Sequence, residues 1–91
     1  MSNSTVIIDV RTPEEFADGH LEGAININIF DPMFEGVVAA LDTSNTYLVY
    51  CRSGQRSGNA LAFMNSVGFD DVTNLGGVAD ASETTGIRIV T

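Results

Sequence analysis

Residues 47–58 read YLVYCRSGQRSG, in which an apolar stretch passes into a polar loop at Cys51. Residues 47–50 have the short apolar character of a buried strand. From residue 55 to residue 67 apolar side chains recur at helical spacing, and Gly68 offers the left-handed position with which many helices end. Cys51 is therefore predicted to stand at the C-terminal end of a strand, in a loop that opens a helix.

The rest of the chain alternates extended and helical patterns. Strands are predicted at residues 6–10, 24–29, 71–75 and 87–90, helices at residues 12–18 and 33–41, and a tight loop at residues 76–77. The first helix begins with Thr12, Pro13 and Glu15, which form a capping-box pattern. Such alternation predicts an α/β fold, with a central, mostly parallel sheet of about four to five short strands and helices on both faces. These sheets bind ligands beyond the carboxyl ends of their strands, where Cys51 is expected to lie.

The composition limits the size of the molecule and the nature of its partners. The chain has 91 residues, of which 44% are hydrophobic, and this length predicts a single domain over residues 1–91. Twelve acidic residues face four arginines, which gives a net charge of −8. Because this excess repels phosphate backbones and anionic lipid surfaces, we expect neither nucleic acid nor a membrane as a partner.

The start of the chain bears on where the protein resides. The first five residues, MSNST, contain no basic residue, and no long apolar run follows them. A signal peptide needs both features, so we expect a cytoplasmic protein. A periplasmic location stays open if a signal was removed ahead of residue 1.

Cys51 is the only cysteine of the chain, so neither an intrachain disulfide nor a CxxC motif can form. Together with a lone histidine, this predicts no metal site, and no cofactor motif is present. A free cysteine is most often a small core residue, and an intermolecular role is a further alternative. Here two arginines, a glycine and two serines follow within six residues, and a core cysteine needs none of them. We therefore predict that Cys51 is a catalytic nucleophile.

The loop after Cys51 has the composition of an anion-binding cup. If it curls at the start of a helix, successive backbone N–H groups point inward. The helix end and the guanidinium groups of Arg52 and Arg56 would then lower the pKa of the thiol. Ser57 either donates to the thiolate or caps the helix, and the sequence leaves both readings open. The predicted substrate-binding residues are Arg52, Ser53, Gly54, Gln55, Arg56 and Ser57.

Four motifs, in order along the chain, resemble those of the rhodanese-like sulfurtransferases. Residues 8–16, IDVRTPEEF, resemble DVRxxxE(F/Y), and residues 19–27, GHLEGAINI, resemble GHIxGAxNI. Residues 51–57, CRSGQRS, match the active loop CRxGxRS, and GF at 68–69 with LGG at 75–77 resembles the C-terminal GF/Y…LxGG motif. The motifs cover nearly the whole chain, and the resemblance is closest to the small single-domain, phage-shock type.

The resemblance implies a rhodanese-like fold and a sulfurtransferase activity. It implies that Cys51 forms a persulfide while loop amides bind the substrate anion, in a double displacement. The implied partners are a small-molecule donor, thiosulfate, and an acceptor, cyanide or a thiol, with a protein sulfur acceptor as a further candidate. A non-catalytic persulfide carrier or binding module is the alternative function.

Two related activities fit the cysteine loop less well. Rhodanese-like phosphatases of the cell-cycle type need an arginine six positions after the cysteine. That position is Ser57 here, and the arginine comes one residue early at Arg56, which leaves the loop too short for a phosphate. Family members that use mercaptopyruvate as the sulfur donor have loops resembling CGSGVT, which lack both arginines, so this donor is less expected here.

The leading motifs are assigned structural roles. Asp9 is expected to support the loops at the end of its strand, and Arg11 to pair with an acid such as Glu15 or Glu22. His20 is expected to be a hydrogen-bonding turn residue and not a base.

The C-terminal part departs from the family pattern. Residues 78–82, VADAS, lack the aromatic residue that many members place after the double glycine. We expect looser or different packing there, and a monomer or a weak homodimer in which a neighbouring subunit covers an open edge.

Overall fold

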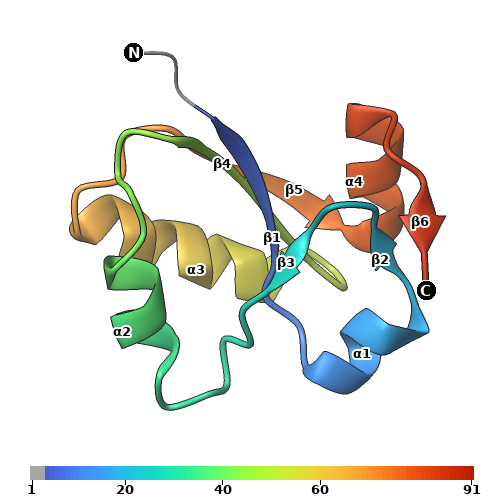
Figure 1. Cartoon of the computed structure of the whole chain (residues 1–91), viewed down its shortest axis with the longest axis horizontal. Helices are drawn as coiled ribbons and strands as arrows, with labels where there is room; N and C mark the ends of the chain where they lie inside the picture. The colour runs from blue at the N-terminus through green and yellow to red at the C-terminus, as the bar shows by residue number, and fades with distance from the viewer. Residues whose placement is uncertain (1–3) are drawn as a thin grey trace.

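The computed structural model describes residues 4–91, so the residues 1–3 that enter the signal-peptide argument lie outside it. The strands in this part of the chain are β1 (Thr5–Asp9), β2 (His20–Leu21), β3 (Ile25–Asn26), β4 (Thr46–Cys51), β5 (Val72–Gly77) and β6 (Ile89–Val90). The helices are α1 (Pro13–Asp18), α2 (Phe34–Ala39), α3 (Gln55–Ser66) and α4 (Val78–Thr85) (Figure 1). Between residues 4 and 91 no helix has the length and apolar character needed to cross a membrane.

The central sheet has the strand order β3-β1-β4-β5, and its neighbouring strands all run parallel. β4 lies inside this sheet, and its residues Tyr47, Val49, Tyr50 and Cys51 are at most 1% exposed. A strand that is covered on both faces excludes water from either side, which explains its unbroken apolar sequence. The α/β fold predicted from the sequence is confirmed.

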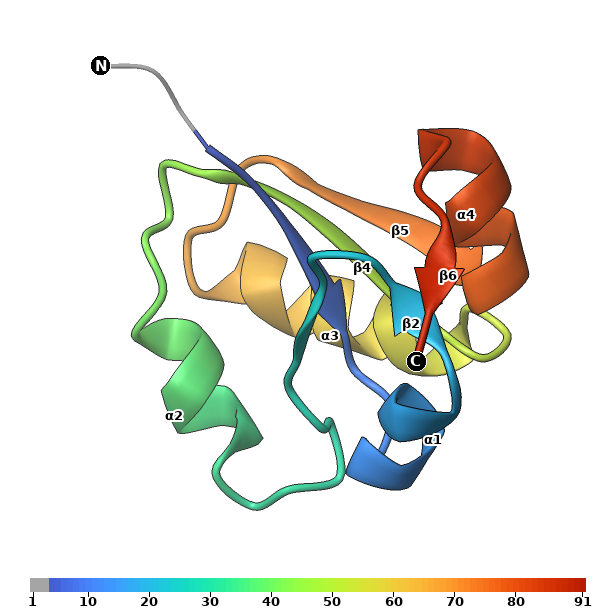
Figure 2. The same ribbon diagram turned by 45° about the vertical axis from the view of Figure 1, so that its right-hand side comes forward.

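Two apolar clusters lie on opposite faces of the sheet because successive side chains of a strand point to opposite sides. Val49 and Cys51 belong to the cluster beneath α2 and α3, together with Met64 of α3. Tyr50 belongs to the other cluster, with Ala81 of α4. Figure 2 shows α2 and α3 on one side of the sheet and α4 with β2 and β6 on the other. The prediction of helices on both faces is confirmed.

Helix α3 is held against the sheet by Ala60 and Met64, which lie one turn apart and are both 1% exposed. Complete burial of a methionine side chain contributes about 1.5–3 kcal/mol. The helix ends at Ser66, and Gly68, two residues farther on, has a φ of +102°, the left-handed conformation predicted for it.

Two short strands differ from the sequence-based prediction. Only Ile25 and Asn26 pair with β1, because β1 itself ends at Asp9, so the strand predicted at residues 24–29 is shorter. His20 lies in β2, which pairs antiparallel with β6, and not in a turn. Its ring stacks on Phe16 at 3.7 Å between centroids, and its Nδ1 lies 2.8 Å from the Phe16 carbonyl oxygen.

The segment after Gly77 also differs. Residues 76–77 belong to β5 and are not a separate loop, and the residues that follow form α4. Ala81 of this helix is fully buried, so a small side chain and a helix cover the sheet here. The packing expected to differ after the double glycine is therefore that of a short helix with a buried alanine.

Candidate active site

Cys51 is the last residue of β4, and the loop that follows it leads directly into α3. Its side chain is fully buried. Gly54 turns the loop with a φ of +97° and forms the N-cap position of α3, where a side chain would be strained. The nucleophile predicted from the sequence therefore lies at the N-terminus of a helix of 12 residues.

The end of β5 supports this loop from behind. A Cβ at Gly54 would lie 3.3 Å from the Cα of Gly76, and a Cβ at Gly77 would collide with the carbonyl oxygen of Arg52. The two backbone segments can approach this closely only because glycines stand at the contact. The double glycine thus determines the position of the cysteine loop.

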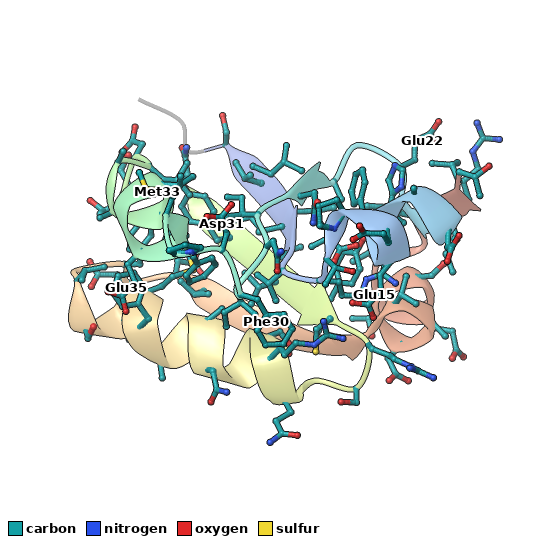
Figure 3. The ribbon with its side chains drawn as sticks, turned by 90° about the horizontal axis from the view of Figure 1, so that it is seen from below. Glu15, Glu22, Phe30, Asp31, Met33 and Glu35 are labelled. Atoms are coloured by element: carbon teal, nitrogen blue, oxygen red, sulfur yellow. The ribbon has the colours of Figure 1, made fainter. Side chains whose placement is uncertain are left out.

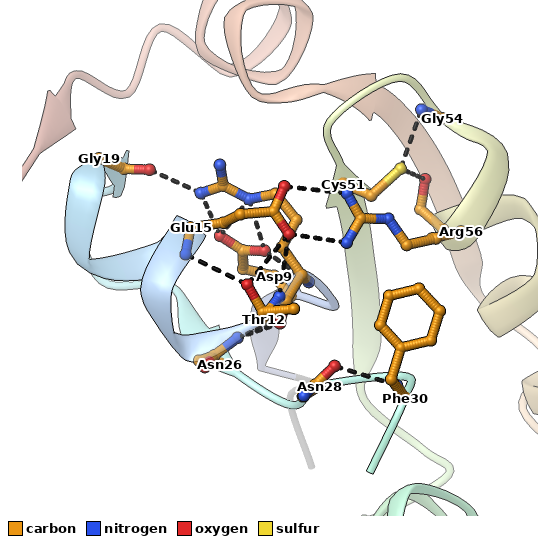
Figure 4. A network of polar contacts seen from close by, with 12 residues as sticks. Asp9, Thr12, Glu15, Gly19, Asn26, Asn28, Phe30, Cys51, Gly54 and Arg56 are labelled. Atoms are coloured by element: carbon orange, nitrogen blue, oxygen red, sulfur yellow. Dashed lines mark hydrogen bonds and ion pairs between the residues drawn. The ribbon is translucent and has the colours of Figure 1, made fainter.

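Two hydrogen-bonding groups contact the sulfur of Cys51. The backbone N–H of Gly54 donates to Sγ at 2.9 Å, and Oγ of Ser57 lies 3.4 Å from Sγ (Figure 4). Burial raises the pKa of the thiol, but hydrogen bonds from Ser57 and from the Ser53 and Gly54 backbone outweigh this effect. The pKa of Cys51 consequently lies below its ordinary value, which favours the nucleophilic thiolate.

Arg56 lies beside the site, but its guanidinium group is held by other residues. Its two terminal nitrogens bond the two carboxylate oxygens of Glu15 at 2.8 and 3.0 Å. Its Cζ lies 5.5 Å from the centroid of the Phe30 ring (Figure 4). The hydrogen bond from Arg56 is the main reason why the pKa of Glu15 falls to about 2. Most of the positive charge predicted for anion binding at Arg56 is therefore compensated by Glu15.

The predicted pairing of Arg11 with Glu15 or Glu22 is wrong. Arg11 pairs with Asp9, whose carboxylate accepts from its Nη2 at 2.6 Å and from its Nε at 2.9 Å. Asp9 is fully buried, and a buried carboxylate requires a close positive partner. Glu15 and Glu22 are instead paired with arginines of α3 and of the C-terminal segment. Asp9 also accepts from the Arg11 backbone N–H at 2.9 Å, and its role in supporting the loops stays a prediction.

Glu15 has a second role that its sequence position did not reveal. Its carboxylate accepts from the backbone N–H of Thr12 at 3.2 Å, as expected for the capping box of α1. The same carboxylate bonds Arg56, which is 41 residues away. The capping pattern is visible in the sequence, but the contact with the cysteine loop exists only because α1 and α3 meet at one end of the sheet.

Ser57 does not cap α3, because the N-cap position is Gly54. Its fully buried hydroxyl lies between Cys51 and Asn74 of β5, with Oγ 2.6 Å from Oδ1 of Asn74. Asn74 was not identified from the sequence. Its contacts reach two residues of the cysteine loop, Gly54 and Ser57.

The remaining predicted binding residues lie on the outside of the loop. Arg52, Ser53 and Gln55 are exposed, and Arg52 is the arginine of the loop that forms no ion pair within residues 4–91. These residues can contact a ligand that approaches from solvent. Within the same part of the chain no group of histidine, cysteine, aspartate or glutamate side chains could hold a metal ion.

A groove borders the site between α3 and the segment that leads into α2. Phe30 stands at its edge and is 66% exposed, although it contacts Arg56. Figure 3 shows Phe30 and Asp31 on the segment before α2, with Met33 and Glu35 at the start of α2. The groove is lined by Ile29, Phe30, Asp31, Pro32, Phe34, Glu35, Asn59 and Phe63.

Known proteins resemble this chain in sequence and in structure. The sequence profile of the rhodanese-like domain family matches residues 1–83. Thiosulfate sulfurtransferase PspE of Escherichia coli (strain K12) is 38% identical over 73 residues, covering 80% of this chain and 70% of that protein. Thiosulfate sulfurtransferase GlpE of Stutzerimonas stutzeri (strain A1501) is 33% identical over 72 residues, covering 79% of this chain and 64% of that protein. A solved structure of a rhodanese with anions from E. coli superimposes with a TM-score of 0.80 at 33% identity, covering 97% of this chain and 99% of that one.

Proposed function

This chain belongs to the rhodanese-like domain family, and from this premise we propose that it is a thiosulfate sulfurtransferase that carries sulfur on Cys51. The observation that carries the proposal is the hydrogen bond of 2.9 Å from the Gly54 backbone N–H to Sγ, at the N-terminus of α3. A backbone donor and the positive end of a helix stabilise negative charge on the sulfur without a general base.

The first half-reaction loads the sulfur. The thiolate of Cys51 attacks the outer sulfur of thiosulfate and forms a new S–S bond. The original S–S bond of thiosulfate breaks, and its electron pair leaves with sulfite. The product is a persulfide whose outer sulfur carries the negative charge.

The second half-reaction transfers the sulfur. The lone pair of cyanide, or of a thiolate acceptor, attacks the outer sulfur of the persulfide. The electron pair of the Cys51–sulfur bond returns to Sγ, and thiocyanate or an acceptor persulfide leaves. The same donors that stabilise the attacking thiolate of Cys51 stabilise it again as a leaving group, so Gly54 acts in both halves.

The charges around the loop suit an anionic donor despite the net charge of −8. Arg52 is exposed beside Cys51, and Arg56 is compensated by Glu15. A free guanidinium attracts a dianion over several ångströms at low ionic strength. In this proposal Arg52 guides thiosulfate to the loop, and the loop amides hold it.

Intact-mass measurement after mixing with thiosulfate tests the proposal. We expect a gain of one sulfur atom in the wild-type chain, its loss on addition of cyanide, and no gain in Cys51→Ala. Because Cys51 is the only cysteine, no other thiol contributes. Absence of the gain under non-reducing conditions would refute the proposed chemistry.

A persulfide carrier that serves a protein acceptor is the second candidate. It is favoured by Phe30, a large apolar side chain left 66% exposed next to Arg56. A carrier loads sulfur but turns over slowly with small acceptors. A thiosulfate:cyanide activity equal to that of Cys51→Ala, in a protein that still gains sulfur, would select the carrier role.

A further inference from the structure

The carboxamide of Asn74 is fixed by two backbone groups of opposite type. The N–H of Gly76 needs an acceptor and lies 2.9 Å from Oδ1, whereas the carbonyl of Gly54 needs a donor and lies 3.0 Å from Nδ2. Exchanging the oxygen and nitrogen of the amide would break both bonds. The atom of Asn74 that faces Ser57 is therefore the carbonyl oxygen.

This orientation determines where the hydroxyl hydrogen of Ser57 lies. Oγ is 2.6 Å from Oδ1 of Asn74, and since a carbonyl oxygen carries no hydrogen, Ser57 must be the donor. A hydroxyl has one hydrogen, so Oγ then presents lone pairs to Sγ of Cys51 at 3.4 Å. A protonated thiol can donate to those lone pairs, but a thiolate would be repelled by them.

We propose that Asn74 is a positioning residue that competes with Cys51 for the hydrogen of Ser57, so that the hydroxyl turns to Asn74 when Sγ is neutral and to Sγ when it is a thiolate. Ser57 and Cys51 are both fully buried, so these two acceptors replace water as partners of the hydroxyl. The catalytic consequence rests on the proposed function. In that cycle Sγ is anionic in the free enzyme and neutral in the persulfide, and the hydroxyl turns once in each half-reaction.

The charged groups around the thiol are the same in wild type, Asn74→Ala, Ser57→Ala and the double variant, whereas Asn74→Asp adds one carboxylate, equally in the presence and absence of Ser57. Arg56 of α3 interacts with Cys51 and is paired with Glu15 of α1. The buried pair of Asp9 and Arg11 lies at the end of β1. Arg52 lies on the loop, and Asp80 of α4 lies behind it, where its Oδ2 accepts from Gly77 N–H at 3.4 Å. A change caused by Asn74 can therefore be separated from these charges by comparing variants.

The test is a titration of the Cys51 thiol by its ultraviolet absorbance, carried out on the sulfur-free full chain with Cys51→Ser as the blank. The double-mutant cycle compares the effect of Asn74→Ala in two backgrounds, one with Ser57 and one with Ser57→Ala. Asn74→Ala also removes the contact with Gly54, but this loss is common to both backgrounds and cancels in the comparison. Without the Asn74 side chain, Sγ of Cys51 is the remaining side-chain partner of the hydroxyl within residues 4–91. We expect the change in thiol pKa caused by Asn74→Ala to be lower in the Ser57 background than in the Ser57→Ala background. The expected difference is about 0.5–1 unit, which corresponds to one hydrogen bond.

Equal effects of Asn74→Ala in the two backgrounds, or a relative rise in the pKa when Ser57 is present, would overturn the proposal. Asn74→Asp is the second variant, because it keeps an acceptor for Ser57 and Gly76. It should raise the thiol pKa more when Ser57 is present than when it is absent, and equal rises would also overturn the proposal. Asn65→Ala, at an exposed asparagine near the far end of α3, is the matched control and should leave the pKa unchanged. The titration uses no sulfur donor, so its outcome is independent of whether thiosulfate loads Cys51.

Discussion

Glu15 and Arg56 connect α1 to the cysteine loop, and replacing Glu15 by glutamine tests what this ion pair contributes to stability. The pKa of Glu15 falls from 4.5 to about 2 in the folded protein, chiefly because of the hydrogen bond from Arg56. At about 1.4 kcal/mol per pKa unit, this shift sets a ceiling of about 3 kcal/mol. The side chains of Arg56 and Glu15 are 22% and 28% exposed, and solvent screening reduces the expected contribution to about 1–2 kcal/mol.

The pH dependence of this contribution has a definite sign. A carboxyl whose pKa is lowered by folding stabilises the protein above its unfolded pKa, and the contribution is lost as the pH falls through the folded pKa. For Glu15 the stabilisation is complete above about pH 4.5 and declines towards about pH 2. Glu15→Gln should therefore lower the free energy of unfolding by about 1–2 kcal/mol at pH 7, and by progressively less as the pH falls below 4.5.

Urea denaturation at a series of pH values, with wild type, Glu15→Gln and Glu14→Gln, measures this difference. Glu14 is the matched control because its replacement removes the same charge from the same turn of α1, but it is exposed and forms no ion pair within residues 4–91. We expect Glu14→Gln to change the free energy of unfolding by less than about 0.5 kcal/mol. Equal losses for the two variants, or a loss for Glu15→Gln that does not shrink below pH 4.5, would refute the reasoning.

Three further predictions concern the loop and the core. In steady-state assays, Arg52→Ala should raise the KM for thiosulfate about two- to fivefold at low salt. The increase should be smaller at high salt, because salt screens an exposed charge. Gly77→Ala should abolish most of the sulfur loading seen by mass, since its Cβ would collide with the Arg52 carbonyl, whereas Gly36→Ala, with open space at that position, should load normally. Met64→Ala should lower the free energy of unfolding by about 2–5 kcal/mol in urea, and a loss below about 1 kcal/mol would contradict its place in the core.

The parts of the fold that were predicted from the sequence depend on local patterns. The short apolar run before Cys51 and the helical spacing after it correctly placed the strand, the loop and α3. The glycine shortly after α3 has the predicted conformation. Residues 78–85 were not predicted as a helix, because small and polar side chains give no clear apolar stripe, yet the buried Ala81 packs this helix into the same cluster as Tyr50.

The parts that were missed depend on contacts between distant segments. The partner of Arg56 is 41 residues away, and the partner of Ser57 is 17 residues away. No local pattern distinguishes a glutamate that caps a helix from one that also reaches a second helix. For the same reason the pairing of the two-residue strands β2 and β6 could not be predicted, since the two strands are far apart in the sequence and meet only in the folded chain. Contacts between such distant segments form only when the sheet and its helices pack together.

The complete burial of Cys51 has a consequence for how the protein withstands oxidation. A disulfide between two copies would require their sulfurs to come within about 2 Å, with the Cα atoms about 4.4–6.8 Å apart. The walls of the loop, backed by the glycines at the end of β5, prevent a second protein backbone from approaching that closely. A small attacking group is not restricted in this way. The buried thiol is thereby shielded from oxidative cross-linking between two copies of the chain, while it stays open to small thiophilic anions.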